Sequence, residues 1–198
     1  EMQRSLVGSE MCIRDRCDIN LIIDESFLDF ADTEDLSLLS EQVLRENRNL
    51  YVVKSISKSY GVPGLRLGIL ASGNTDMIGR LKKDVSIWNI NSMAEFFMQI
   101  LDKYKSDYTD SLRKIKEERS RFLIELCAIK NLKVYPSQAN YFMCEILDGI
   151  SSEELAGRLL KENILIKDLT GKIHNGKQYI RICLLYTSPS PRDYAASR

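Results

Sequence analysis

The sequence predicts an α/β fold with a mostly parallel sheet, joined to a smaller α+β domain. Two short apolar runs, INLIID and LYVVKS, are typical of buried strands in a parallel sheet. Apolar residues between them recur at helical spacing, as a strand–helix–strand unit requires. Farther along the chain, the order changes to strand–strand–helix–strand–strand, which favours a second domain of the α+β type.

The first half of the chain supplies the strands of the larger domain. Three apolar runs are expected to be strands: Ile19–Asp24, Leu50–Ser55 and Leu67–Ser72. Between the first two, Leu36, Leu39 and Val43 place an apolar stripe on a helix. The third run follows a glycine-rich turn, which lets the chain bend tightly before it.

Helices are expected to follow the third strand. NTDMIGRLKKD favours a short helix, and SMAEFFMQILDKY favours an amphipathic one whose start has the capping-box spacing, Ser92 with Glu95. From Tyr108 to about Ile129, apolar residues at helical spacing predict a long helix. We interpret these apolar stripes as packing faces and not as ligand sites.

The last third of the chain predicts the smaller domain. LKVYPS, ANYFMCEIL, ILIKDL and YIRIC are typical of strands, and SSEELAGRLLKEN is typical of a capped helix. We assign residues 17–107 to the C-terminal part of a large domain and residues 108–182 to an incomplete small α+β domain. The ends, 1–16 and 183–198, lack periodicity and are interpreted as non-native tails, with disordered native tails as the alternative. The chain is therefore expected to be a fragment.

The composition argues against several classes of function. The 28 basic and 28 acidic residues give a net charge of zero, which argues against a nucleic-acid-binding surface. No run approaches the ~20 apolar residues of a membrane span. Five cysteines without a C-x-x-C pair, and the single histidine His174, argue against a disulfide scaffold, a metal site or a Ser-His-Asp triad. A reducing cytoplasm is the expected location.

Residues that could carry chemistry follow two of the predicted strands. Because the strand ends of a parallel sheet meet at one edge, Asp24 and Lys58 are expected to face the same crevice. A lysine that forms a Schiff base must be partly desolvated, and a buried acid opposite it suits a cofactor with a pyridinium nitrogen. Ser55, Ser57 and Arg66 offer two hydroxyls and a guanidinium to a phosphate. Each residue alone is more often a turn residue or a solvated charge, and their conjunction indicates a site.

The segments DESF (24–27), SISK (55–58) and RLG (66–68) resemble the class I and II aminotransferases, which are fold type I enzymes dependent on pyridoxal phosphate (PLP). Within them, the chain is most similar to the branch of histidinol-phosphate aminotransferases and threonine-phosphate decarboxylases. KDVSIWNINSMAEFF and PSQANYF resemble the aminotransferase half of bacterial proteins fused to a nucleotidyltransferase. The likeness covers about residues 18–182.

The resemblance implies PLP as the cofactor and a role for each matching residue. Lys58 would bind the cofactor covalently and then move a proton. Asp24 would keep the pyridine nitrogen protonated. The cofactor phosphate would be bound by Ser55, Ser57 and Arg66.

Two further positions bear on the substrate. Arg181, in QYIRIC, matches the arginine that binds the substrate α-carboxylate, with a surface arginine as the alternative. Phe27 replaces a tyrosine whose hydroxyl binds the phenolic oxygen of PLP, which leans away from histidinol phosphate and towards the decarboxylase-like branch. The resemblance also implies a homodimer that moves an amino group between an amino acid and a 2-keto acid, with no nucleic-acid or membrane partner. Because the family draws other site residues from sequence before Asp24, the fragment is expected to be inactive alone.

Other interpretations of the lysine segment are weaker. Ser55-x-x-Lys58 fits the S-x-x-K motif of penicillin-binding serine hydrolases, but the S-D-N and K-T-G motifs are missing from the sequence. Gly61-Val-Pro-Gly64 fits the G-x-x-G of an RNA-binding KH loop, but the proline and the zero net charge argue against it. A PLP-dependent decarboxylase and a non-catalytic remnant stay open as alternatives to an aminotransferase.

Overall fold

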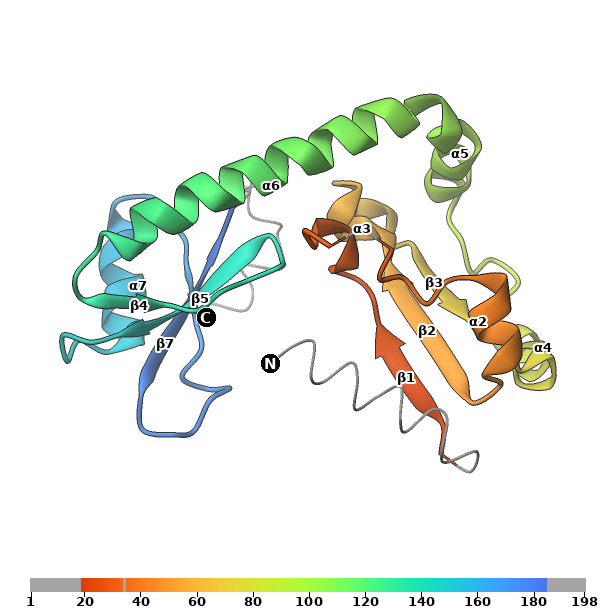
Figure 1. Ribbon diagram of the computed structural model, residues 1–198, viewed down its shortest axis with the longest axis horizontal. Coiled ribbons are helices and arrows are strands. Elements are labelled where there is room, and N and C mark those ends of the chain that lie inside the picture. The colour runs from red at the N-terminus through yellow and green to blue at the C-terminus, as the bar shows by residue number, and fades with distance from the viewer. Residues whose placement is uncertain (1–18, 34, 185–198) are drawn as a thin grey trace. The chain divides into compact units, whose positions relative to one another are not determined.

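The computed structural model describes residues 19–33 and 35–184, whose helices and strands are labelled in Figure 1. The chain forms two compact units, which part between Asp110 and Ser111. This point lies inside a long helix, α6 (Lys105–Cys127), so each unit contains a part of that helix.

The first unit is built on a three-stranded sheet with the order β1-β2-β3. β1 (Leu21–Asp24) runs parallel to β2 (Leu50–Ser55), as the strand–helix–strand pattern predicts. β3 (Gly68–Ala71) runs antiparallel to β2, because the glycine-rich turn between them reverses the chain. The other elements of this unit are η1 (Leu28–Phe30), α2 (Glu41–Glu46), α3 (Ile56–Ser59), η2 (Pro63–Leu65), α4 (Thr75–Asp84), α5 (Ser92–Ile100) and η3 (Leu101–Tyr104).

The helix between β1 and β2 is shorter than the sequence predicts. The helix α2 begins after Ser40, whose hydroxyl accepts a hydrogen bond from the amide of Val43 at 3.2 Å. The residues before it are extended because the buried carboxylate of Glu25 accepts hydrogen bonds from the Leu38 amide (2.6 Å) and the Ser37 hydroxyl (2.7 Å). This tertiary contact outweighs the helical spacing of the leucines.

The long helices begin at other residues than those predicted. The N-cap of α5 is Asn91, whose side-chain oxygen accepts a hydrogen bond from the Ala94 amide at 2.9 Å, so the capping box predicted at Ser92 is wrong. The helix α6 begins at Lys105, three residues before the predicted start at Tyr108. A short 3-10 segment, η3, leads directly into it and fixes its first turn.

The second unit confirms the predicted order strand–strand–helix–strand–strand. Its four-stranded antiparallel sheet has the order β4-β5-β7-β6. The elements are β4 (Leu132–Val134), β5 (Tyr141–Ile146), α7 (Ser152–Lys161), β6 (Lys167–Asp168) and β7 (Gln178–Cys183). One buried cluster forms the core beneath this sheet: Leu126, Phe142, Cys144, Ile146, Ile166 and Ile180.

The tails predicted at residues 1–16 and 183–198 lie outside the described residues, apart from Cys183 and Leu184 at the end of β7. The three cysteines in the described part of the chain are free thiols. In that same part, none of the helices combines the length and the apolar character that crossing a bilayer requires.

Candidate functional site

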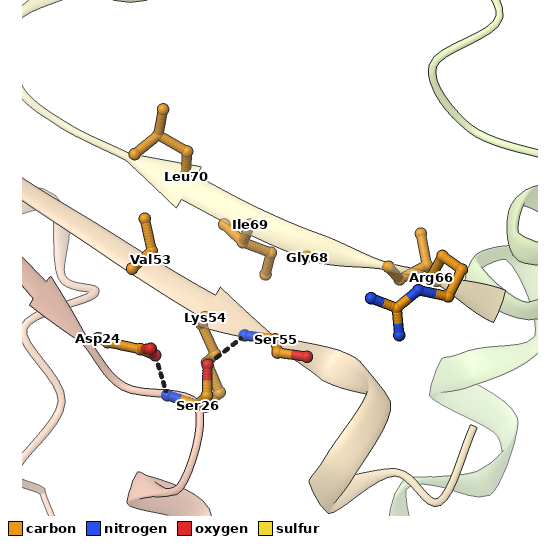
Figure 2. A pocket seen from close by; sticks show the side chains of 10 residues that line it. Asp24, Ser26, Val53, Lys54, Ser55, Arg66, Gly68, Ile69 and Leu70 are labelled. Atoms are coloured by element: carbon orange, nitrogen blue, oxygen red, sulfur yellow. Dashed lines mark hydrogen bonds between the residues drawn. The ribbon is translucent and has the colours of Figure 1, made fainter. Parts of the chain in front are cut away.

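The carboxyl ends of β1 and β2 border an open pocket of about 460 Å³ (Figure 2). Because the two strands are parallel and in register, Asp24 at the end of β1 lies beside Val53, two residues before the end of β2. Strand ends in such sheets are the usual place for a ligand. The pocket is lined by Asp24, Ser26, Val53, Lys54, Ser55, Arg66, Leu67, Gly68, Ile69 and Leu70.

The carboxylate of Asp24 supplies the negative charge of the pocket. It accepts a hydrogen bond from the Ser26 amide at 2.9 Å, and bonding to Ser26 and the nearby charge of Lys58 hold the pKa of Asp24 below its ordinary value. Asp24 is therefore ionised at neutral pH. Sequence reasoning placed a buried acid here, but the side chain is exposed, since β1 is an edge strand of the described sheet.

The positive end of the pocket is formed by Arg66 and the hydroxyl of Ser55. Figure 2 shows both groups on the side away from the carboxylate of Asp24. Arg66 follows η2 in a left-handed conformation, with φ 55° and ψ 41°, and its guanidinium donates to the Pro63 carbonyl at 3.3 Å. This conformation turns the arginine back over the end of β2.

Lys58 lies on α3, a single helical turn that directly follows β2. Its Nζ lies 3.7 Å from the centre of the Phe27 ring, and its side chain is exposed. Ser57, beside it, is buried, and no group in the described residues binds its hydroxyl. Neither these two residues nor Phe27 line the pocket, so three of the six predicted cofactor residues lie next to it and three lie in it.

These residues fit PLP. The cofactor has a basic pyridine nitrogen near one end and a phosphate near the other, and the pocket presents a carboxylate opposite a guanidinium and a hydroxyl.

Sequence reasoning missed the residue that joins the two strand ends. The hydroxyl of Ser26 accepts a hydrogen bond from the Ser55 amide at 2.9 Å, while its own amide binds Asp24 (Figure 2). The signal was present, since a short polar residue two positions after an aspartate is typical of an Asx turn. The predicted roles of the pocket residues depend on this link.

Arg181 belongs to β7 of the second unit. Its guanidinium lies 5.2 Å from the centre of the Tyr141 ring, and its Nε is buried with no hydrogen-bond partner among the described residues. Lys167 of β6 stands directly opposite Arg181 in the sheet, so both cations point to the same face. Sequence reasoning missed this lysine because strand register is not visible in the sequence.

Three relatives show how far the similarity extends. A CMP-5'-(3-aminopropyl)phosphonate synthase of Streptomyces rubellomurinus is 36% identical over 83% of this chain and 26% of its own length. An L-serine phosphate decarboxylase of Campylobacter jejuni is 35% identical over 82% of this chain and 43% of its own length. A threonine-phosphate decarboxylase of Salmonella typhimurium is 31% identical over 94% of this chain and 50% of its own length. The chain thus spans half or less of these relatives.

Solved structures share the fold. A decarboxylase from Sulfurospirillum multivorans has a TM-score of 0.78 at 31% identity, over 90% of this chain and 47% of its own. The histidinol-phosphate aminotransferase from Clostridium acetobutylicum has a TM-score of 0.79 at 26% identity, over 92% of this chain and 54% of its own. The sequence profile of aminotransferase class I and II matches residues 12–198. The chain therefore belongs to the class I and II aminotransferase family, whose members are fold type I enzymes dependent on pyridoxal phosphate.

Proposed function

We propose that the full-length protein containing this chain is a PLP-dependent aminotransferase that moves the α-amino group of an amino acid to a 2-keto acid. The observation that carries the proposal is the pocket at the ends of β1 and β2, where Asp24 faces Ser55 and Arg66. When bound, PLP withdraws electrons from the substrate α-carbon and so makes its bonds easier to break.

The predicted site residues would have distinct roles in binding the cofactor, binding the substrate and moving a proton. The ionised carboxylate of Asp24 would hold a proton on the pyridine nitrogen, since the two opposite charges stabilise each other. Arg66 and the two serine hydroxyls would bind the phosphate with charge-assisted hydrogen bonds. The amine of Lys58 would attach the cofactor and then carry the α-proton on its Nζ. Arg181 would bind the α-carboxylate, for which its free Nε–H is a ready donor.

A second candidate function is decarboxylation of an amino acid that carries a phosphate. Three relatives above 30% identity are named as serine-phosphate or threonine-phosphate decarboxylases. The paired cations Lys167 and Arg181 on one sheet face also suit a substrate with both a carboxylate and a phosphate. The two candidates differ in the bond that breaks at the α-carbon, so a product assay separates them.

The test supplies the full-length protein with O-phospho-L-serine, O-phospho-L-threonine and their unphosphorylated counterparts, with and without 2-oxoglutarate. Transamination predicts a new keto acid only when 2-oxoglutarate is present, and no carbon dioxide. Carbon dioxide released without any keto acid would establish the second candidate instead. Lys58→Ala should abolish either product and the borohydride-fixed cofactor. If this variant still bound PLP in a form that borohydride fixes, another lysine would hold the cofactor and the assignment of Lys58 would be refuted.

Substitution of Lys167 tests the class of substrate independently of the type of reaction. Lys167→Met should lower kcat/KM for phosphorylated substrates by about tenfold to a hundredfold, because a charge-assisted hydrogen bond is lost. The same variant should leave unphosphorylated substrates within about twofold, as expected for a group that touches only the phosphate. Equal losses for both kinds of substrate would show that Lys167 does not recognise a phosphate.

We also propose that the full-length protein is a cytoplasmic homodimer, which light scattering and cell fractionation would test. The isolated 198-residue chain should bind PLP weakly and turn over no substrate, because it spans about half of its relatives' length. Robust transamination by the isolated chain would refute that expectation.

A further inference from the structure

The position of Lys58 depends on contacts outside its own helix. It lies on α3, which has only four residues, and a single turn is not stable by itself. Within this region, the Tyr60 amide binds the Ile56 carbonyl at 3.3 Å and the Val62 amide binds the Ser57 carbonyl at 3.1 Å. These bonds close the turn but leave its orientation to the side chains that pack on it.

Aromatic rings contact both the lysine and the helical turn that carries it. The Nζ of Lys58 lies 3.7 Å from the centre of the Phe27 ring, directly before η1. Tyr60, at the end of α3, stacks on Tyr108 of α6, with ring centres 4.0 Å apart and planes at 3°. The ring centres of Tyr60 and Phe97 lie 6.2 Å apart in a T-shaped arrangement. The arrangement therefore has two sides: the ring before η1, which contacts the lysine itself, and the ring stack at the end of its turn.

One carboxylate joins these two sides. Asp29, in η1, forms an ion pair with Lys54 of β2 and accepts a hydrogen bond from the Tyr108 hydroxyl at 2.8 Å. Burial would raise the pKa of Asp29, but hydrogen bonding to its carboxylate, that of Lys54 foremost, and the charge of Lys54 outweigh burial and lower that pKa. Burial and the adjacent carboxylate raise the pKa of Tyr108, so its hydroxyl stays a proton donor.

We propose that Tyr108 is a positioning residue for Lys58, an inference that rests on the proposed function. Its hydroxyl fixes η1 through Asp29, and with it the segment that carries Phe27. Its ring fixes the end of α3 through Tyr60. A single side chain thus holds both sides of this arrangement, so the amine is presented to the cofactor in one direction. Binding of the cofactor then carries no added free-energy cost of ordering the turn.

The test measures covalent capture of PLP by the full-length protein, not turnover. Borohydride fixes the cofactor, and mass spectrometry of the Lys58 peptide gives the PLP concentration for half-maximal capture. Tyr108→Phe keeps the stacked ring and removes the hydroxyl, and we expect half-maximal capture at about fivefold to tenfold more PLP. Tyr108→Leu, which also loses the stack, should show a larger shift. The control is Tyr104→Phe, since Tyr104 lies exposed just before α6.

Tyr60 tests the other side of the arrangement. Tyr60→Leu removes the stack and should shift capture in the same direction, whereas Tyr60→Phe keeps it and should restore wild-type capture. If Tyr108→Leu gives no soluble protein, Tyr108→Phe and Tyr60→Leu still decide the question.

A merely structural role predicts a different pattern. In that case the Tyr108 and Tyr60 variants would lower the melting temperature while half-maximal capture stayed at the wild-type concentration, and the inference would be overturned. Failure of the PLP assignment is distinguishable, because the wild-type protein itself would then fix no PLP at Lys58. The choice between transamination and decarboxylation does not affect this test, because both candidates attach the cofactor to Lys58.

Discussion

Arg66 combines a strained backbone with the cation expected to bind the phosphate, and one substitution separates the two. Its φ of 55° lies in the left-handed region, which costs a residue with a Cβ about 1–2 kcal/mol. Glycine removes that strain but loses about 0.5–1 kcal/mol through greater freedom of the unfolded chain. We therefore expect Arg66→Gly to be more stable than Arg66→Ala by about 0.5–1 kcal/mol.

The affinity for PLP should fall in both variants, although they differ in stability. Both variants lose a charge-assisted bond of about 1.5–3 kcal/mol, which corresponds to roughly tenfold to a hundredfold weaker binding. Urea unfolding of the cofactor-free protein measures the first effect, and absorbance titration with PLP measures the second. Asn163→Gly is the control, because Asn163 has a φ of 61° and lies beside α7 of the second unit. The reasoning fails if Arg66→Gly binds PLP as the wild type does, or if it is no more stable than Arg66→Ala.

Further predictions concern the frame of the first unit. A Cβ at Gly73 would overlap the backbone of α2, so Gly73→Ala should cost about 3 kcal/mol, whereas Gly79→Ala inside α4 should add about 0.5–1 kcal/mol, both by urea unfolding. Because the pKa of Asp29 is lowered in the folded state, this carboxylate stabilises the fold at pH values above its unfolded-state pKa of about 3.9, and that stability is lost as the pH falls towards the folded-state pKa. Asp29→Asn should flatten this acid limb of the stability curve. Glu25→Ala should speed amide exchange in residues 36–39 by about tenfold or more, whereas the exposed control Glu41→Ala should not.

Local patterns predicted the elements well, because spacing and turn residues are properties of neighbouring positions. The parallel pair β1 and β2 follows from apolar runs alone, and so does the succession of strands and helix along the second unit. The order of those strands in the sheet was not predicted. The segment from Asp24 to Arg66 could be interpreted for the same reason, since its chemical groups follow two strand ends that the fold brings together. Two outcomes differed from the expectation: Asp24 and Lys58 are both exposed, and Phe27, Ser57 and Lys58 do not line the pocket.

What the sequence could not show depends on contacts between distant positions. Glu25 shortens α2 by binding residues 37 and 38, and no periodicity reports that bond. Tyr108 and Asp29 are 79 positions apart, and Lys167 meets Arg181 only through strand register. These contacts orient the groups that the local motif supplies, so they decide how the site works.

Side chains of the helix α6 hold other residues in place near predicted site residues in both units. Near its start, Tyr108 binds Asp29 of the first unit. Farther along, the buried side chain of Arg119 donates to the carbonyl of Gln138 at 3.0 Å, in the loop that leads to Tyr141 beneath Arg181. Loss of a buried charged bond weakens this loop, so Arg119→Ala should raise KM for the amino acid by about tenfold and leave PLP capture unchanged.

Tyr108→Phe should do the reverse, weakening capture of PLP while changing KM little. The contacts named for the two residues lie in different units. The double variant should therefore show both losses, each in its own quantity and each as large as in the single variant. Titration of PLP capture and steady-state kinetics on the four proteins measure this directly. If either single variant altered both quantities alike, α6 would be transmitting strain between the units, and the two supports could not be treated as independent.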